Sequence, residues 1–166
     1  MKRALILGGG FGGLATAHAL RQKLSADDEI IVVDRRTHFM MGLRKSWVLT
    51  GNTTMEAGQR PLSLLEARGI KWINGSITSI DPATRSISVG GRRIEADALV
   101  VALGAQMAVD KVPGFQDYAV NVYSHEAVPY AAEAVRNFKG GILAVGIFGA
   151  PYQCPPAPYE IALTLN

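Results

Sequence analysis

The sequence contains little of what marks disulfide-rich or membrane-spanning proteins. It has one cysteine, Cys154, and 7% aromatic residues. A single cysteine cannot close a disulfide within the chain, so a disulfide-stapled secreted domain is excluded. A run of about 18 apolar residues would predict a membrane-spanning helix, and the sequence has none. With 166 residues, 48% hydrophobic and 19% charged, the chain can bury the core of one full domain.

Positive charge is present but scattered. The net charge is +3, and the basic pairs Arg35-Arg36, Arg44-Lys45 and Arg92-Arg93 lie far apart in the sequence. No aromatic residues alternate with them, and they form no basic stripe on a helix, which a nucleic-acid surface would favour. We therefore interpret these pairs as solvated edges and expect no nucleic-acid partner.

The most informative stretch is residues 5–13, where three aliphatic residues lead into a glycine-rich turn. Gly8, Gly10 and Gly13 occupy the three fixed positions of a G-x-G-x-x-G pattern. Gly8 lets the chain reverse, Gly10 removes a Cβ that would hold a diphosphate away, and Gly13 lets helix and strand pack closely. A helix predicted over residues 14–24 would direct the free N–H groups of its first turn at that diphosphate. The stretch therefore predicts a diphosphate site.

A second apolar run, residues 29–33, ends in Asp34 about 20 residues after Gly13. An acid at that position can accept hydrogen bonds from a ribose 2′-hydroxyl and disfavours a 2′-phosphorylated ligand. The order strand, glycine turn, helix, strand and acid predicts an α/β, Rossmann-like dinucleotide-binding domain with a parallel sheet. An ordinary βαβ unit with a solvated Asp34 remains the alternative.

The middle of the chain predicts further parts of this domain. Residues 77–80 and 87–89 alternate apolar and polar side chains around a turn, which indicates a crossover β-hairpin continued by residues 92–95. Residues 97–105 form another buried strand that closes on Gly104. Glycine there lets a flat ligand approach the backbone, or it marks an ordinary turn from strand to loop.

After a helix predicted over residues 125–138, a strongly apolar run at residues 142–148 predicts a second strand, and a further helix begins shortly before Asn166. We therefore expect residues 1–139 to form the dinucleotide domain and residues 140–166 to be the start of a second one. A helix begun so close to the chain's end suggests a piece of a longer protein.

Cys154 and Glu160 are the candidate catalytic residues. Cys154 precedes a predicted helix N-terminus, where the helix dipole stabilises a thiolate that can attack sulfur or flavin; a buried structural thiol is the alternative. Glu160 falls in the first turn of that helix. It would either move a proton at the same site or simply complement the dipole.

On these residues, the chain resembles the N-terminal part of the sulfide:quinone oxidoreductase family and of the flavoprotein subunit of flavocytochrome c sulfide dehydrogenase. Three places carry the resemblance: the glycine turn with Asp34, the strand of residues 97–105, and the segment A-P-Y-Q-C-P-P-A-P-Y-E at residues 150–160. Many flavoproteins with two dinucleotide domains share the first two. The third is far more specific. The resemblance as a whole extends over nearly the whole chain.

The resemblance implies FAD as the cofactor of the first domain. Where the flavocytochrome relatives carry the cysteine that attaches FAD covalently, this sequence has Met41, so the implied FAD is non-covalent. The implied roles are the FAD diphosphate for Gly8, Gly10, Gly12 and Gly13, its ribose for Asp34, its adenine for Arg35, and the border of the cofactor for Gly104.

The resemblance also implies that Cys154 belongs to a redox pair that takes up sulfide sulfur, and that reduced flavin passes electrons to a quinone or a haem protein. The partner cysteine would lie beyond Asn166, since Val122 and Tyr123 stand where bacterial relatives have another cysteine. The implied location is cytoplasmic, with peripheral contact to the inner membrane through a C-terminal part.

Two other functions stay open. A type II NADH dehydrogenase would use the same first domain but needs a glycine fingerprint after residues 142–148, where only Gly146 and Gly149 stand. A non-catalytic nucleotide-binding module is the other alternative.

Overall fold

The computed structural model describes residues 1–42, 44–149, 152 and 154–165. The chain divides into two compact units. Unit 1 comprises Met1–Phe39 and Arg60–Ala105, and unit 2 comprises Met40–Gln59 and Gln106–Asn166. Two short strands, β3 (His38–Met40) and β4 (Gln59–Pro61), pair where the chain leaves unit 1 and returns to it. The expected domain boundary between residues 139 and 140 stays a prediction.

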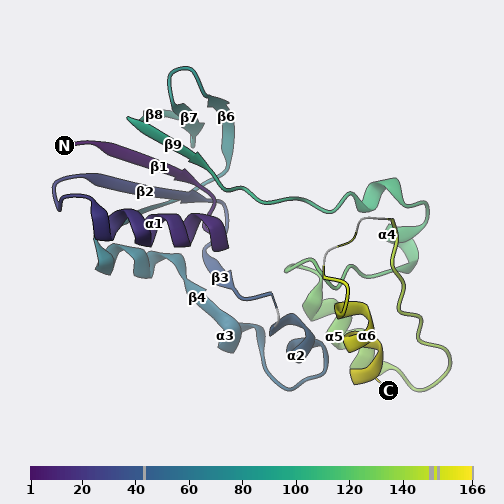
Figure 1. The fold of residues 1–166 in the computed structure, drawn as a ribbon. Coiled ribbons are helices and arrows are strands. Elements are labelled where there is room, and N and C mark those ends of the chain that lie inside the picture. Colours follow the sequence, from purple (N-terminus) through teal and green to yellow (C-terminus); the bar gives the residue numbers. More distant parts are fainter. Residues whose placement is uncertain (43, 150–151, 153, 166) are drawn as a thin grey trace. The chain divides into compact units, whose positions relative to one another are not determined.

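A four-stranded parallel sheet forms the centre of unit 1, with the strand order β5-β2-β1-β9 (Figure 1). Leu7, near the end of β1, lies beside Val33 of β2 and Val101 of β9, so the strands end at a common edge. The parallel sheet predicted from the apolar runs is confirmed. Its strands are β1 (Arg3–Leu7), β2 (Glu29–Asp34), β5 (Lys71–Asn74) and β9 (Ala98–Val101).

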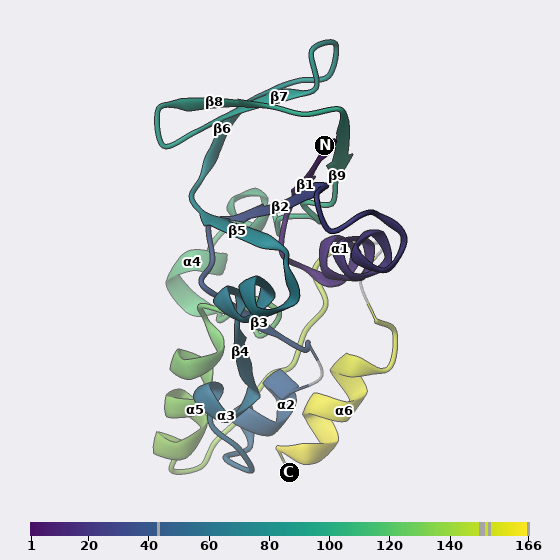
Figure 2. The same ribbon diagram turned by 90° about the vertical axis from the view of Figure 1, so that its left-hand side faces the viewer.

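Alternating side chains of the sheet enter two different cores. Ile6 and Val32 are fully buried against α1 (Phe11–Lys23) and the 3₁₀-helix η1 (Leu62–Arg68). Leu5, Leu7 and Val33 point to the opposite face and pack against the inserted antiparallel strands. Because side chains alternate along a strand, strands that are apolar at every position require cover on both faces. Figure 2 shows that cover, with α1 on one side of the sheet and the insertion on the other.

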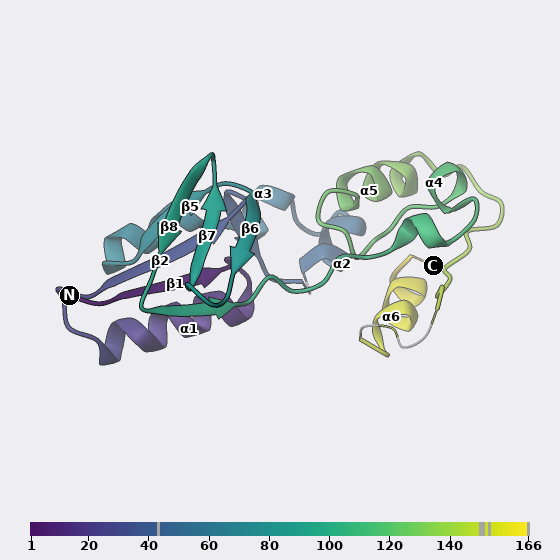
Figure 3. The same ribbon diagram turned by 90° about the horizontal axis from the view of Figure 1, so that it is seen from above.

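The insertion is a three-stranded antiparallel sheet of β6 (Ile77–Asp81), β7 (Ser86–Val89) and β8 (Arg92–Glu95) (Figure 3). It lies in the sequence between β5 and β9, and the expected crossover hairpin with its continuation is therefore confirmed. The buried side chains of Ile87 and Val89 join it to the parallel sheet.

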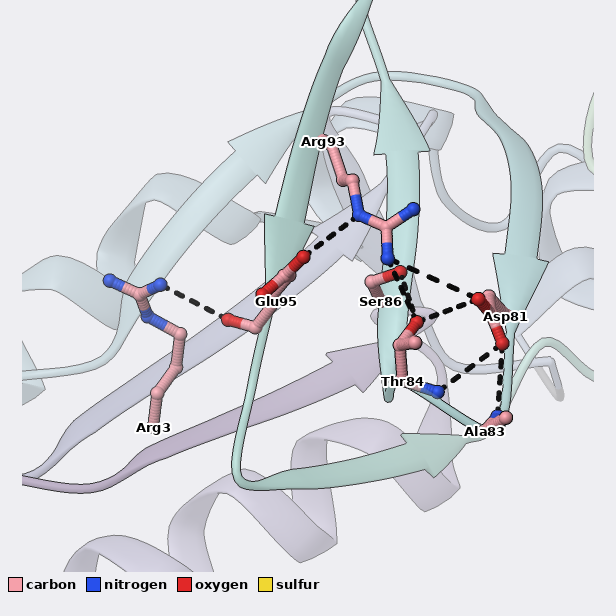
Figure 4. Close-up of polar contacts among 7 residues, drawn as sticks. All are labelled: Arg3, Asp81, Ala83, Thr84, Ser86, Arg93 and Glu95. Carbon is pink, nitrogen blue, oxygen red and sulfur yellow. Dashed lines mark hydrogen bonds and ion pairs between the residues drawn. The ribbon is translucent and has the colours of Figure 1, made fainter.

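The turn between β6 and β7 is held by hydrogen bonds around Asp81 (Figure 4). Its carboxylate accepts bonds from the Thr84 hydroxyl at 2.7 Å and from the Ala83 N–H at 3.0 Å. These bonds lower the pKa of Asp81 below its usual value: the hydrogen bond from the Thr84 hydroxyl is the largest cause, and the one from the Thr84 N–H is the next. Arg93 donates to the Thr84 hydroxyl at 3.0 Å and to Glu95 at 2.9 Å. The network therefore joins the turn to β8.

Glu29 links three strands of the parallel sheet. Its carboxylate, with only 12% of the side chain exposed, pairs with Lys71 of β5 and Arg3 of β1. The Lys71 ammonium lowers the pKa of Glu29 most strongly; burial opposes this, and the Arg3 guanidinium adds to the lowering. Arg3 also donates to the carbonyl of Glu95 at 3.1 Å, which ties β1 to the insertion (Figure 4).

Unit 2 is built from short helices. Val48 of α2 packs with Val128 and Ala132 of α5, while Leu49 packs with Ala131 of α5 and Ile161 of α6. Among the described residues, no helix has both the length and the apolar character needed to cross a membrane. The helices are α2 (Arg44–Leu49), α3 (Met55–Gly58), η2 (Val109–Lys111), α4 (Phe115–Tyr118), α5 (Val128–Asn137) and α6 (Ala157–Thr164).

Two expectations for this part of the chain were wrong. Helix α5 begins at Val128 rather than near His125, because Pro129 has no N–H and fits best in the first turn of a helix. Residues 142–148 form no strand, and Ile142 is 95% exposed. Apolar composition alone does not make a strand: a stable strand needs neighbours in a sheet, and the described residues supply none there.

Candidate dinucleotide-binding site

The turn between β1 and α1 depends on two glycines that have no room for a side chain. Gly8 has φ +102°, and a Cβ on it would lie 2.4 Å from the carbonyl oxygen of Ala102. A Cβ on Gly13 would lie 1.8 Å from the carbonyl oxygen of Gly8. Backbone atoms make both close approaches, so no side-chain movement can relieve them. These glycines bring helix, turn and β9 together.

Gly10 lies in open space and leaves the start of α1 accessible. A Cβ on Gly10 would have no atom within 4 Å, and one on Gly12 would make only an ordinary contact with Ala102. Gly10 is the N-cap of α1, has no side-chain cap, and accepts the Leu14 N–H at 2.9 Å. The N–H groups of the residues before Leu14 have no acceptor within the helix, as in any first turn. The turn therefore fits an anion such as a diphosphate.

Asp34 lies at the end of β2 and faces the glycine turn. It is buried, with 6% of its surface exposed, and its Oδ2 accepts the Gly9 N–H at 2.7 Å. Burial by itself would raise the pKa of Asp34, but the Arg36 guanidinium, the Arg36 N–H and the Gly9 N–H together lower it below the usual value. Asp34 is therefore a carboxylate at neutral pH.

Arg36 is a residue of the candidate site that the sequence analysis missed: it is exposed, as expected for a solvated edge, but it also pairs with Asp34. Its guanidinium donates from Nε to Oδ1 of Asp34 at 3.2 Å and from Nη2 to Oδ2 at 3.0 Å. Its backbone N–H also donates to Oδ1, at 2.8 Å. An arginine two residues after an acid that ends a strand was the available signal. Arg35 is exposed, and its carbonyl oxygen accepts a bond from Asn74 at 3.0 Å.

Gly104 lies just beyond β9, at the edge of the sheet where the glycine turn lies. The Ala102 N–H donates to the Leu7 carbonyl at 2.8 Å, which keeps the chain beside β1 as it leaves β9. Gly104 then adopts φ +71°, and a Cβ added to it would have no atom within 4 Å. Glycine favours this backbone conformation, and here it leaves the backbone accessible.

Two more residues border the turn and had no distinguishing signal in the sequence. Phe11 begins α1, is 62% exposed, and contacts Phe39 edge-to-face with ring centroids 5.0 Å apart. Leu62 of η1 packs so closely on the turn that a Cβ on Gly9 would lie 2.8 Å from its Cδ1. The turn therefore has a closed floor on the Leu62 side and an exposed aromatic ring at the start of the helix.

The candidate catalytic residues lie in unit 2. Cys154 is exposed, so the buried-thiol alternative is wrong. It has φ +57°, and its carbonyl oxygen accepts the Ala157 N–H at 3.1 Å, at the start of α6. Glu160, in the first turn of α6, accepts a hydrogen bond from the Ser46 hydroxyl at 3.0 Å. Residues 150, 151 and 153 of the family-specific segment lie outside the described part of the chain.

The pKa of Tyr123 is affected by the charge of Cys154. Burial chiefly raises the pKa of Tyr123, and the charges of Cys154 and Tyr152 raise it further. Tyr123 precedes α5 and is half-buried. Met41, where a covalent flavin cysteine would stand, is 46% exposed.

The parallel sheet, with a glycine turn and an acid at neighbouring strand ends, defines a Rossmann-like domain of the FAD/NAD(P)-binding class. Residues 2–146 match the family described as pyridine nucleotide-disulphide oxidoreductase. The chain belongs to this family.

Similar proteins include both kinds of quinone-linked oxidoreductase considered above. The chain is 28% identical to the mitochondrial sulfide:quinone oxidoreductase of Mus musculus, over 95% of the chain and 36% of the relative. It is 31% identical to the alternative NAD(P)H-ubiquinone oxidoreductase C1 of Arabidopsis thaliana, over 99% of the chain and 36% of that relative. The sulfide:quinone oxidoreductase structure from Aquifex aeolicus matches with a TM-score of 0.77 and 27% identity, over 82% of this chain and 32% of that one. The chain thus spans about a third of the length of these relatives.

Proposed function

We propose that this chain is the FAD-binding part of a flavoprotein that oxidises sulfide and passes the electrons through non-covalent FAD to a quinone. The observation that carries the proposal is the open glycine turn at Gly10, which faces the buried carboxylate of Asp34 at one edge of the sheet. A diphosphate and a ribose are the two groups that such an arrangement binds. The sulfide:quinone oxidoreductases among the similar proteins support the choice of substrate.

In this proposal the residues of unit 1 bind and orient the cofactor. Gly8 and Gly13 shape the turn, while Gly10, Gly12 and the first N–H groups of α1 hold the diphosphate. Asp34 accepts hydrogen bonds from the adenosine ribose, Arg35 lies near the adenine, and Gly104 lets the cofactor approach the end of β9. FAD, when bound, supplies the two-electron redox chemistry.

The residues of unit 2 would handle sulfur and protons. Cys154 is exposed and lies three residues before α6, so its sulfur is accessible to a small substrate. In a disulfide with a cysteine that is not in this sequence, it would be attacked by sulfide. The S–S bond would break, and one of the two cysteines would become a persulfide and the other a thiol. Glu160, held by the Ser46 hydroxyl, would accept or return a proton there.

The names of these relatives specify quinones, which reside in membranes, and this supports a quinone acceptor and peripheral contact with a membrane. We propose that the protein is cytoplasmic and that the membrane it contacts is the inner membrane. A haem protein is the other acceptor to be tested. We keep residues 140–166 as the proposed start of a second dinucleotide-type domain.

One observation favours a second candidate function, that of an NAD(P)H:quinone oxidoreductase. The Arabidopsis relative has 31% identity, slightly above the sulfide enzymes. Against it, Gly146 and Gly149 do not make a three-glycine fingerprint of the kind expected for NADH.

Flavin bleaching separates these functions. First, the purified chain is mixed with FAD, and we expect it to retain the flavin, whereas Gly10→Val should not. In the full-length protein, sulfide should bleach the flavin and NADH should not. Cys154→Ser should abolish bleaching by sulfide while FAD stays bound, and Tyr152→Phe serves as a neighbouring control. Bleaching by NADH alone would support the second function, and a protein that never binds FAD would refute both.

A further inference from the structure

The carboxylate of Asp34 is already saturated with hydrogen bonds. Oδ1 accepts the Arg36 backbone N–H and Arg36 Nε, while Oδ2 accepts the Gly9 N–H and Arg36 Nη2. An ionised carboxylate offers about four acceptor positions, two on each oxygen. The side chain of Asp34 is also only 5% exposed. With Arg36 in place, Asp34 has no acceptor position left for a ribose.

The four bonds are of two kinds. Those from the Gly9 and Arg36 backbone N–H groups belong to the turn that shapes the site and are fixed with it. Those from the Arg36 guanidinium come from a side chain that is 41% exposed, so it can swing outward without opening the core. Its fork donates one bond to each carboxylate oxygen. A ribose 2′,3′-diol also offers two adjacent donors, one for each oxygen.

We infer that the Arg36 guanidinium occupies the two acceptor positions on Asp34 that a ribose diol requires, so that Arg36 sets how strongly the site discriminates for an intact diol. The inference rests on the proposed dinucleotide function and adds a residue to its specificity. When an adenine nucleotide binds, Asp34 loses its two hydrogen bonds from the Arg36 guanidinium and gains two from the ribose diol. Part of the binding energy is therefore used to break the ion pair between Arg36 and Asp34. Exposed or half-exposed ion pairs contribute up to about 1 kcal/mol, which corresponds to about fivefold in affinity.

The test compares ADP with 2′,3′-dideoxy-ADP, which lacks both ribose hydroxyls. Dissociation constants are measured by isothermal titration calorimetry for the whole 166-residue chain and its variants. The readout is the ratio of the dideoxy-ADP constant to the ADP constant, because the attraction of the diphosphate to positive charge cancels in it. Removing the guanidinium in Arg36→Gln should raise this ratio about threefold to fivefold.

Matched variants separate this effect from loss of charge or of fold. Lys23→Gln removes the same charge from an exposed position in the last turn of α1, outside the nucleotide site, and should leave the ratio unchanged. Arg36→Lys keeps the charge but loses the two-pronged geometry, and its ratio should lie between those of the wild type and Arg36→Gln. Asp34→Asn should bring the ratio close to one. Circular dichroism confirms that each variant is folded.

The outcomes also separate this inference from the proposed function. An unchanged or lower ratio in Arg36→Gln, with ADP bound normally, would overturn the role of Arg36 and leave dinucleotide binding intact. If Lys23→Gln raised the ratio equally, the effect would be one of charge, and the inference would again fail. A wild-type chain that binds neither nucleotide would overturn the proposed function and this inference together.

Discussion

The backbone N–H of Gly9 donates a hydrogen bond to Oδ2 of Asp34 across 2.7 Å. This bond joins the turn after β1 to the end of β2, so the expected diphosphate site and the expected ribose site form one structure. The carboxylate thereby fixes the conformation of the turn before any ligand arrives. Changes at either residue are therefore expected to affect stability and nucleotide binding together, although to different extents.

Gly13→Ala and Gly10→Ala should separate folding from binding. The new Cβ at residue 13 would lie 1.8 Å from the Gly8 carbonyl oxygen, so we expect a loss of about 3 kcal/mol or more in the free energy of unfolding. The Cβ at residue 10 meets nothing, and the change at this N-cap should cost less than about 1 kcal/mol. Urea unfolding and ADP titration measure the two effects. Gly10→Ala should lose ADP affinity while folded; equal destabilisation by both would contradict this account.

Asp34 should contribute to stability at neutral pH and lose that contribution in acid. Its folded-state pKa lies below the usual value, so the contribution is complete above the unfolded-state pKa of about 3.9 and disappears as the pH falls through the folded-state pKa. Asp34→Asn should therefore be less stable than the wild type at pH 7, with the gap narrowing below about pH 4.

Urea unfolding across this pH range measures the difference between the two proteins. Because Glu29 and other acids also have lowered pKa values, the gap, and not the wild-type curve alone, reports on Asp34. A gap that stayed constant with pH would show that the ionised carboxylate adds no stability.

Glu29→Gln should weaken the parallel sheet. The carboxylate pairs with Arg3 and Lys71 on the two strands that flank β2, and little of it is exposed. We expect a loss of about 1 kcal/mol that shrinks in high salt. Glu95→Gln is the control, because Glu95 is mostly exposed in its pair with Arg93 and should cost less than about 0.5 kcal/mol. Thermal unfolding at low and high salt measures both variants. If the ion pairs of Glu29 added nothing, Glu29→Gln and Glu95→Gln would lose the same stability at both salt concentrations.

Thr84→Val should raise the pKa of Asp81. The Thr84 hydroxyl is the main cause of the lowered value, while the N–H groups of Thr84 and Ala83 would remain (Figure 4). We therefore expect a partial return toward the ordinary pKa, measured from the carboxyl ¹³C shift of Asp81 in an NMR titration. Thr78→Val, three residues earlier in the same strand β6, should leave that titration unchanged. A pKa of Asp81 that did not move would remove the hydroxyl from its causes.

Local signals predicted much of the site. Gly8 and Gly13 could be identified from spacing alone because their requirement is steric and set within a few residues. Asp34 could be placed because the end of a strand fixes its position at the edge of the sheet. Arg36 could not be placed, because the conformation of the turn decides whether its side chain extends into solvent or pairs with Asp34. The sequence located the glycines and Asp34, but not the arginine that pairs with Asp34.

Expectations that depended on distant partners were less successful. The apolar run at residues 142–148 has the composition of a strand, yet the sequence does not say what would pair with it. The start of α5 was misplaced by three residues: the Ser124 hydroxyl, just before the expected start, donates to Glu126 at 2.7 Å and caps no helix. Pairing and capping are decided by geometry that composition does not contain.

Unit 1 is assembled from two stretches, Met1–Phe39 and Arg60–Ala105, with residues 40–59 looped out between them. During synthesis β1, α1 and β2 leave the ribosome first, but they must wait for β5 and β9 before both edges of the sheet are filled. Once Ala105 has emerged, every strand of that sheet is available, while residues 40–59 are the only part of unit 2 that has left the ribosome. Unit 1 can therefore fold early, and a ribosome stalled when Ala105 has just emerged should already protect β1 from proteolysis.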